Sequence, residues 1–172
     1  PETETEITVT FGKPGYLTLS IPEYNDGWTV TASPDGTLTD KDKNSYGYLF
    51  YEALVKRKAF STEKGFVIPG NKRAEAFREI LTSYGFNEQE TADFIEYWAD
   101  YLKYGTDYVM YPMLTEGVDN AMPLTFSVKP DSIYRIWFGF AEYSGDEITP
   151  PEITPIIRKG FTIVEWGGAV LD

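Results

Sequence analysis

Two helix-like segments lie between two groups of strand-like segments, and this order constrains the fold most. Apolar residues recur at helical spacing within residues 71–85 and again within 87–105. A glycine closes each segment, as is typical of helix C-termini. Because only about three residues separate the two segments, the sequence predicts an αα-hairpin at about residues 71–104.

Both predicted helices begin at an asparagine. Asn71 precedes the first apolar repeat, and Asn87 precedes the second. Asparagine is a preferred N-cap because its side-chain oxygen accepts a backbone N–H. Glu90 follows Asn87 at the spacing of a capping box, so we expect both asparagines to be N-caps.

Strand patterns flank the hairpin on both sides. Residues 6–11 and 16–21 alternate with period two around a Gly/Pro turn, which predicts that they pair as a β-hairpin. Residues 48–54 are apolar on both faces, which is typical of a covered central strand. Residues 37–47 are polar and predict a loop. The other strand patterns cover residues 27–32, 108–113, 124–128, 132–141 and 161–166.

This order predicts an α+β fold with mainly antiparallel, sandwich-like sheet and the helices on one side. A chain of 172 residues has the length of one domain. We therefore expect a single domain over residues 1–172, with the polar residues 1–6 flexible. Because the chain begins at Pro1, we expect it to be processed or part of a longer protein.

The composition excludes several kinds of chemistry. The chain has no Cys and no His, so disulfides, thiolates and catalytic triads with histidine are excluded. It has 15 basic and 27 acidic residues, a net charge of −12, and residues 87–172 hold 5 basic and 15 acidic ones. We expect no nucleic-acid partner and no membrane insertion, because acidic surfaces repel phosphates and no apolar run reaches about 20 residues. We interpret an acidic helix face, formed by Asp93, Glu96 and Asp100, as solvated surface.

Arg135 is the most anomalous charge, because it interrupts a segment that is apolar on both faces, residues 132–138. A buried guanidinium keeps its charge and needs an acidic partner. Glu52 and Glu165 also lie within apolar strand patterns. We therefore predict that Arg135 pairs with Glu52, with Glu165 or with both.

Two interpretations of these three residues remain open. In one, the group is a buried structural ion pair. In the other, Glu52 and Glu165 are catalytic carboxylates of a hydrolase beside Arg135, with a carbohydrate as the most plausible substrate, since glycosidases use two neighbouring acids. No motif in the sequence marks a reaction, so we favour the structural interpretation.

A calcium site is the one cofactor that the sequence suggests. Asp40, Asp42 and Asn44 alternate as oxygen ligands do at the start of an EF-hand loop. The pattern then fails, because Ser45 replaces the expected glycine and Tyr51 the expected glutamate. We therefore favour a solvated loop.

Three tyrosines follow helical spacing beside an apolar stripe. Tyr97, Tyr101 and Tyr104 lie next to Phe94 and Trp98 in the second predicted helix. Exposed aromatic side chains of this kind mark binding surfaces, with protein or carbohydrate as possible partners. The alternative is that they cover the edge of a sheet.

Four segments together resemble a known kind of domain. They are PEYNDGWTVTASPDG at 22–36, YLFYEA at 48–53, FIEYW at 94–98 and RKGFTIVEWGG at 158–168. In this order they resemble a group of bacterial exported or surface-protein domains without established activity, over about four-fifths of the chain. The resemblance implies an extracellular or cell-surface location and a module type, without a mechanism.

These observations favour a structural or binding module of a bacterial surface or secreted protein. A hydrolase that uses acidic residues on carbohydrate is one alternative. An acidic domain that binds a cationic protein is the other.

Overall fold

A computed structural model describes residues 1–171, and it has the α+β content that the sequence predicts. The chain forms two compact units. The first unit contains residues 1–59, 115–133 and 158–164, and the second contains residues 60–114 and 134–157 and the chain from Glu165 onward. The expectation of a single domain stays a prediction. No helix among the described residues is long and apolar enough to cross a membrane.

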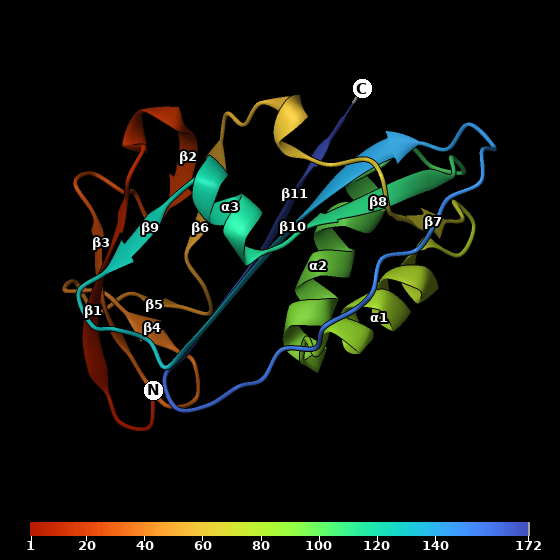
Figure 1. Cartoon of the computed structure of the whole chain (residues 1–172). Helices are drawn as coiled ribbons and strands as arrows, with labels where there is room; N and C mark the ends of the chain where they lie inside the picture. Colours follow the sequence, from red (N-terminus) through yellow and green to blue (C-terminus); the bar gives the residue numbers. More distant parts are fainter. Residues whose placement is uncertain (172) are drawn as a thin grey trace. The chain divides into compact units, whose positions relative to one another are not determined.

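The first unit consists mainly of antiparallel sheet (Figure 1). Its five-stranded sheet has the order β5-β4-β3-β1-β9, and a two-stranded sheet pairs β2 with β6. The elements are β1 (Thr5–Phe11), η1 (Pro14–Tyr16), β2 (Leu17–Ile21), β3 (Trp28–Ala32), β4 (Leu38–Thr39), β5 (Ser45–Tyr46), β6 (Phe50–Ala53), η2 (Arg57–Ala59), α3 (Thr115–Ala121) and β9 (Leu124–Phe126). Since β1 begins at Thr5, the last two of the six residues expected to be flexible belong to the sheet.

An aromatic cluster joins the two sheets of the first unit. The ring of Phe11 on β1 meets the rings of Tyr24, Trp28 and Tyr51 edge to face, with centroid distances of 5.0, 5.4 and 4.7 Å. The backbone N–H of Phe11 also donates to the hydroxyl of Tyr24 at 2.8 Å. Because Tyr51 belongs to the two-stranded sheet, the cluster brings the two sheets of this unit into contact.

The predicted hairpin of residues 6–11 and 16–21 is wrong. β1 pairs with β3, from Thr5 opposite Ala32 to Val9 opposite Trp28. Both strands bury every second side chain, whereas β2 has no fully buried residue. Burial of matching apolar faces therefore decided the pairing, and the short turn did not.

The structure corrects two further strand predictions in this unit. Residues 48–54 do not form a covered central strand, because β6 pairs only with β2, and Tyr48 and Leu54 are 55% and 69% exposed. The predicted loop at 37–47 contains the short strands β4 and β5.

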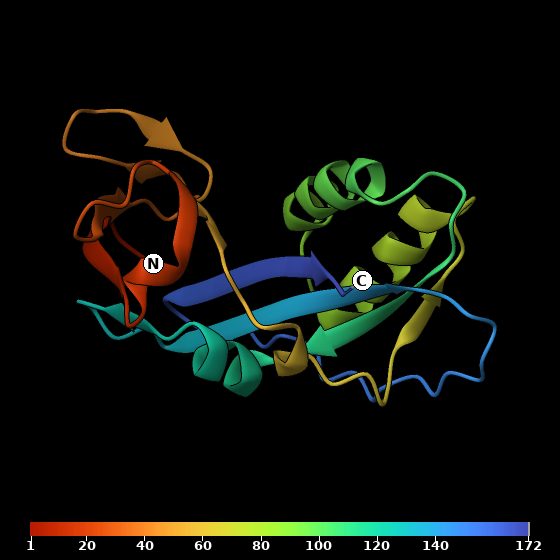
Figure 2. The ribbon, with the colours of Figure 1, turned by 90° about the horizontal axis from the view of Figure 1, so that it is seen from above.

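The second unit packs two helices against a mixed sheet. The sheet order is β11-β10-β8-β7, and the helices lie on one of its faces (Figures 1 and 2). The elements are β7 (Phe66–Ile68), α1 (Arg73–Tyr84), α2 (Glu88–Tyr101), β8 (Tyr108–Met113), β10 (Ser132–Glu142) and β11 (Thr162–Val170). The first two residues of β10 and the first three of β11 belong to the first unit. The predicted αα-hairpin is confirmed.

β10 and β11 run in the same direction, as their arrows show in Figure 2. Later residues of β11 contact later residues of β10, as expected for parallel strands. A Cβ on Gly167 would lie 3.0 Å from Trp137, and the N–H of Leu171 donates to the carbonyl of Phe140 at 2.8 Å. The connection between the strands contains no helix. It is held by backbone bonds that include Gly65 N–H to the Thr149 carbonyl at 3.0 Å.

The two helices begin differently. α2 begins with the predicted capping box, in which Asn87 and Glu90 exchange hydrogen bonds of 2.9 Å. The predicted cap Asn71 is wrong, because α1 starts at Arg73 and its N-cap is Lys72, without a side-chain bond. Gly85 has a φ of 88° and closes α1 in the left-handed conformation that glycine adopts without strain.

Arg73 replaces the missing cap interaction with a contact between the helices. Its guanidinium is buried and donates to the carbonyls of Ala99, Leu102, Lys103 and Thr106 at 2.7 to 3.1 Å. These carbonyls lie at and after the end of α2, where the helix dipole places partial negative charge. A single side chain at the start of α1 thus donates to the carbonyl groups at and after the end of α2 and holds the two helices of the hairpin together.

We expect Arg73→Ala to lower the free energy of unfolding by about 2–4 kcal/mol, because four carbonyls lose a charged donor. Arg78→Ala is the matched control, since Arg78 lies exposed on the same helix and should change stability by less than about 0.5 kcal/mol. Urea denaturation followed by circular dichroism measures both. Equal effects of the two variants would contradict the capping role.

Candidate functional site

Arg135 and Glu165 form a bidentate ion pair in the second unit. Arg135 Nε lies 2.7 Å from Glu165 Oε2, and Arg135 Nη2 lies 3.2 Å from Glu165 Oε1. The Arg135 side chain is only 1% exposed and that of Glu165 is 14% exposed. The predicted pairing with Glu165 is confirmed, and its paired, charge-assisted geometry is the strong form of such a contact.

A tryptophan completes the group. Trp137 Nε1 donates to Glu165 Oε1 at 2.8 Å. Arg135 and Trp137 are two residues apart on β10, so their side chains lie on the same face of the sheet. Gly167 allows the indole to lie against β11, because a Cβ there would be 3.1 Å from Trp137 Nε1. These residues are defined here as the Arg–Glu–Trp group.

The bonds of Glu165 define what it can do chemically. Both carboxylate oxygens accept hydrogen bonds, and one of the donors is a permanent cation. The arrangement suits a structural anchor better than an acid that must hold and release a proton.

Glu52 has a different environment. It lies exposed on β6 of the first unit, opposite Leu19 of β2. Its strand pattern looked like that of Glu165, but β6 belongs to a two-stranded sheet, whereas β11 belongs to a four-stranded sheet. A catalytic role for Glu52, Glu165 and Arg135 stays an untested hypothesis.

Asp40 organises the loop between β4 and β5. Its Oδ1 accepts the backbone N–H groups of Asp42 and Asn44 at 2.8 and 2.9 Å. Its Oδ2 accepts from the Asn44 amide at 2.9 Å and from the Tyr46 hydroxyl at 3.0 Å. The side-chain bond from Asn44 is the main cause that lowers the pKa of Asp40, and the bond to Asp40 raises the pKa of Tyr46.

The three suggested calcium ligands therefore form a hydrogen-bonded turn. Asp40 is an Asx-turn acceptor for the loop that contains Asp42 and Asn44. Within residues 1–171 no three acidic side chains gather closely enough to hold a metal ion. Calcium binding at this loop stays a prediction.

Two of the three candidate tyrosines lie on α2. The rings of Tyr97 and Tyr101 stack at a centroid distance of 5.7 Å and an angle of 12°. They are 37% and 61% exposed, and both meet Trp98 edge to face. Tyr104 follows the end of the helix and is 99% exposed. These three side chains are called the tyrosine face.

Acidic residues accompany the tyrosine face. Glu96 and Asp100 are exposed on α2, and Asp93 is half-buried one turn before Tyr97. The second unit has 6 basic and 15 acidic residues, a net charge of −9 out of the chain's −12. The acidity that the sequence places in its second half thus belongs mainly to the unit that carries the tyrosines.

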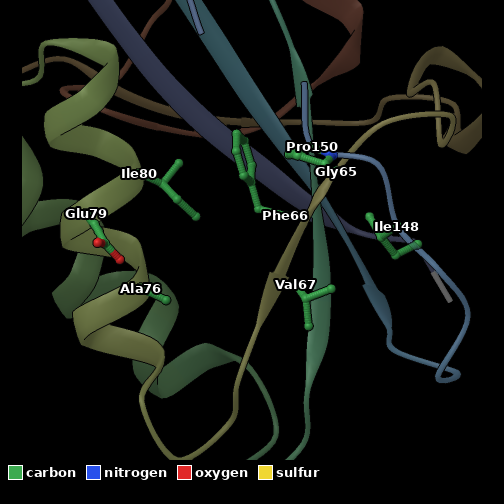
Figure 3. A pocket seen from close by; sticks show the side chains of 8 residues that line it. All are labelled: Gly65, Phe66, Val67, Ala76, Glu79, Ile80, Ile148 and Pro150. Carbon is green, nitrogen blue, oxygen red and sulfur yellow. The ribbon is translucent and has the colours of Figure 1, made fainter. Parts of the chain in front are cut away.

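A pocket that no sequence pattern predicted lies between β7, α1 and the segment after β10 (Figure 3). Its volume is about 350 Å³, and its walls include the apolar side chains of Phe66, Ile80 and Ile148. Glu79 is the one charged residue among those that line it. Its lining comes from three separate parts of the chain, so no sequence motif could reveal it.

The hydroxyl of Tyr134 is buried and has no hydrogen-bond partner within the described residues 1–171. This residue lies beside Arg135 in sequence, on the opposite face of β10, where its ring meets Phe86 at 6.3 Å. Burial raises the pKa of Tyr134 to about 12. Burial also raises the pKa of Tyr84, with a smaller contribution from the charge of Tyr134.

No protein-family model, curated protein or solved structure matches this chain.

We expect Glu165→Gln to lower the free energy of unfolding by about 3–5 kcal/mol, because it removes the carboxylate charge that is bonded to the buried Arg135 guanidinium. Glu142→Gln is the control. Glu142 pairs with Lys103 at the surface, so its loss should cost about 0–1 kcal/mol. Chemical denaturation measures both, and a Glu165→Gln variant as stable as the control would contradict a buried structural pair.

The raised pKa of Tyr134 predicts a loss of stability in alkali. The unfolded phenol ionises near pH 10 while the folded one keeps its proton to about pH 12, so stability present below pH 10 falls as pH rises through this window. We expect Tyr134→Phe to reduce this fall without destabilising the protein at pH 7. A Tyr134→Phe variant that shows the same fall as the unchanged protein would contradict this account. Denaturation between pH 7 and about pH 11.5 gives both profiles.

Proposed function

We propose that this chain is a binding module of a bacterial surface or secreted protein, and that the tyrosine face is its contact surface. The observation that carries the proposal is the exposure of Tyr97, Tyr101 and Tyr104, at 37%, 61% and 99%. Tyr104 is too exposed to serve mainly as cover for a sheet edge. The location in this proposal rests on the sequence resemblance alone.

Stacked tyrosines suit a binding surface physically. A tyrosine offers a large apolar ring and a polar hydroxyl while it loses little conformational freedom on binding. The rings of Tyr97 and Tyr101 stack on each other and also contact Trp98, so the surface is partly ordered before a partner binds. Such preorganisation reduces the entropic cost of association.

The charges near these tyrosines favour a basic protein as partner. Glu96 and Asp100 are exposed on the same helix, within a unit of net charge −9. Carboxylates attract lysine and arginine, and tyrosine rings bind the same side chains through cation–π contacts. The cationic-partner alternative from the sequence thus becomes the preferred form of the binding proposal.

The hydrolase alternative has weaker support. Glu165 accepts hydrogen bonds from Arg135 and Trp137 on both oxygens. A glycosidase needs a second carboxylate that can exchange a proton or attack the sugar. We therefore assign Glu165 to the fold and the tyrosine face to function.

We expect the protein to bind peptides rich in lysine and arginine on an array, and to bind acidic peptides and glycans more weakly. Tyr97→Ala combined with Tyr101→Ala should weaken binding of the selected peptide at least about tenfold, because exposed aromatic anchors contribute 1 kcal/mol or more each. Isothermal titration calorimetry gives the dissociation constants.

Tyr48→Ala is the matched control, since Tyr48 is 55% exposed in the first unit. Equal losses from the control and the double variant would contradict the tyrosine face. Selection of a glycan that depends on Tyr97 and Tyr101 would replace the basic protein with a carbohydrate as the ligand. Binding by none of the array members would contradict the proposal as a whole.

A further inference from the structure

β11 is an edge strand of the second unit's sheet. Its only neighbour in the described sheet is β10. The part of β11 in this unit, residues 165–170, contains one charged residue, Glu165, and that side chain is bonded to Arg135. Unpaired backbone groups along such an edge can pair with another strand.

The direction of the backbone groups follows from one hydrogen bond. The N–H of Leu171, directly after β11, donates to the Phe140 carbonyl of β10. Because N–H groups along a strand point alternately to the two sides, those of Trp166, Gly168 and Val170 point to the open side. These three residues define the open edge.

The other edge of the same sheet is protected in ways that β11 lacks. β7 has three residues, and the chain just before it, at Gly65, is bonded to Thr149, which is followed by two prolines. β11 has nine residues and contains no proline and no lysine. Short length, proline and lysine are the usual features that prevent strand addition, so the open edge of β11 is the accessible one.

The open edge belongs to the same side of the unit as the tyrosine face. α2 packs on β11, since Phe94 meets Trp166 at a centroid distance of 5.4 Å and a Cβ on Gly168 would lie 2.7 Å from the Trp98 ring. Trp98 in turn contacts the rings of Tyr97 and Tyr101. Trp98 therefore connects the edge strand to the tyrosine face.

We propose that the open edge of β11 binds an extended, basic segment of a partner protein, which pairs with it as an additional strand. The backbone of the segment would bond to Trp166, Gly168 and Val170, and its lysine or arginine side chains would reach the tyrosine face and Asp100. This inference rests on the proposed function and names the mode of recognition. A second copy of the chain is a poor occupant, because two units of net charge −9 repel each other.

The test uses a blocked eight-residue peptide of alternating lysine and valine as the probe, and a peptide of alternating glutamate and valine as its control. ¹H–¹⁵N NMR of the whole chain records chemical shifts and amide hydrogen exchange. We expect the basic peptide to slow exchange at Trp166, Gly168 and Val170 at least about tenfold, because each amide gains a hydrogen bond. The acidic peptide should leave these rates unchanged.

Two valines provide matched variants on the two edges of the sheet. Val170 on β11 is 37% exposed and Val67 on β7 is 39% exposed. Val170→Lys should weaken peptide binding at least about tenfold, since it places a like charge on the edge that the peptide approaches. Val67→Lys adds the same charge at the other edge and should change binding less than about twofold.

The outcomes separate this inference from the proposed function. Binding that depends on Tyr97 and Tyr101 without protection of the open edge would overturn strand addition and leave the tyrosine face intact. Protection of the open edge that does not depend on the tyrosines would support strand addition and contradict the tyrosine face. Equal effects of the two valine variants, or protection caused by self-association at the edge, would also overturn the inference.

Discussion

The buried charge of Arg135 is the constraint on which the second unit depends. A guanidinium cannot lose its proton at accessible pH, so its burial requires a countercharge within hydrogen-bond reach. Glu165 provides that countercharge from β11 and also accepts a bond from Trp137. The pairing places β11 beside β10 in one register, and a shift of one residue would turn Glu165 to the other face of the sheet. We infer that this need for a partner selects the strand pairing, since apolar side chains alone would tolerate other registers.

The two buried arginines of this unit have different hydrogen-bond acceptors. Arg135 uses a carboxylate, whereas Arg73 uses four carbonyls near the end of α2. The first solution fixes one strand against another, and the second fixes one helix against another. Neither of these contacts uses Glu96 or Asp100, the exposed carboxylates of α2 that we propose meet a partner.

The sequence predicted those features that depend on local pattern. The αα-hairpin and the capping box at Asn87 followed from spacing. The need of Arg135 for an acidic partner followed from one charge in an apolar segment, with Glu52 and Glu165 as the candidates, and the structure shows the pair with Glu165. The predictions failed where the outcome depended on distant residues. Glu52 and Glu165 share a sequence pattern, but Glu52 lies exposed in a two-stranded sheet, whereas Glu165 is bonded to the buried Arg135 in a four-stranded sheet. In the sequence, Arg73 looks like an ordinary surface residue, and only its contacts with the end of α2 show that it is buried. The helix α3 was not predicted, because its seven residues bury only Val118 and therefore show no helical apolar pattern.

A double-mutant cycle between Arg135 and Glu165 tests the central claim most directly. The variants are Arg135→Met, Glu165→Leu and their combination, and the measured quantity is the free energy of unfolding. If the pair serves the fold, each single change destabilises the protein by several kcal/mol and the double variant recovers most of the loss, because no unpaired charge remains buried. The coupling should then be about 2–3 kcal/mol. Additive effects, with a coupling below about 0.5 kcal/mol, would contradict the claim that the sheet is built around this pair.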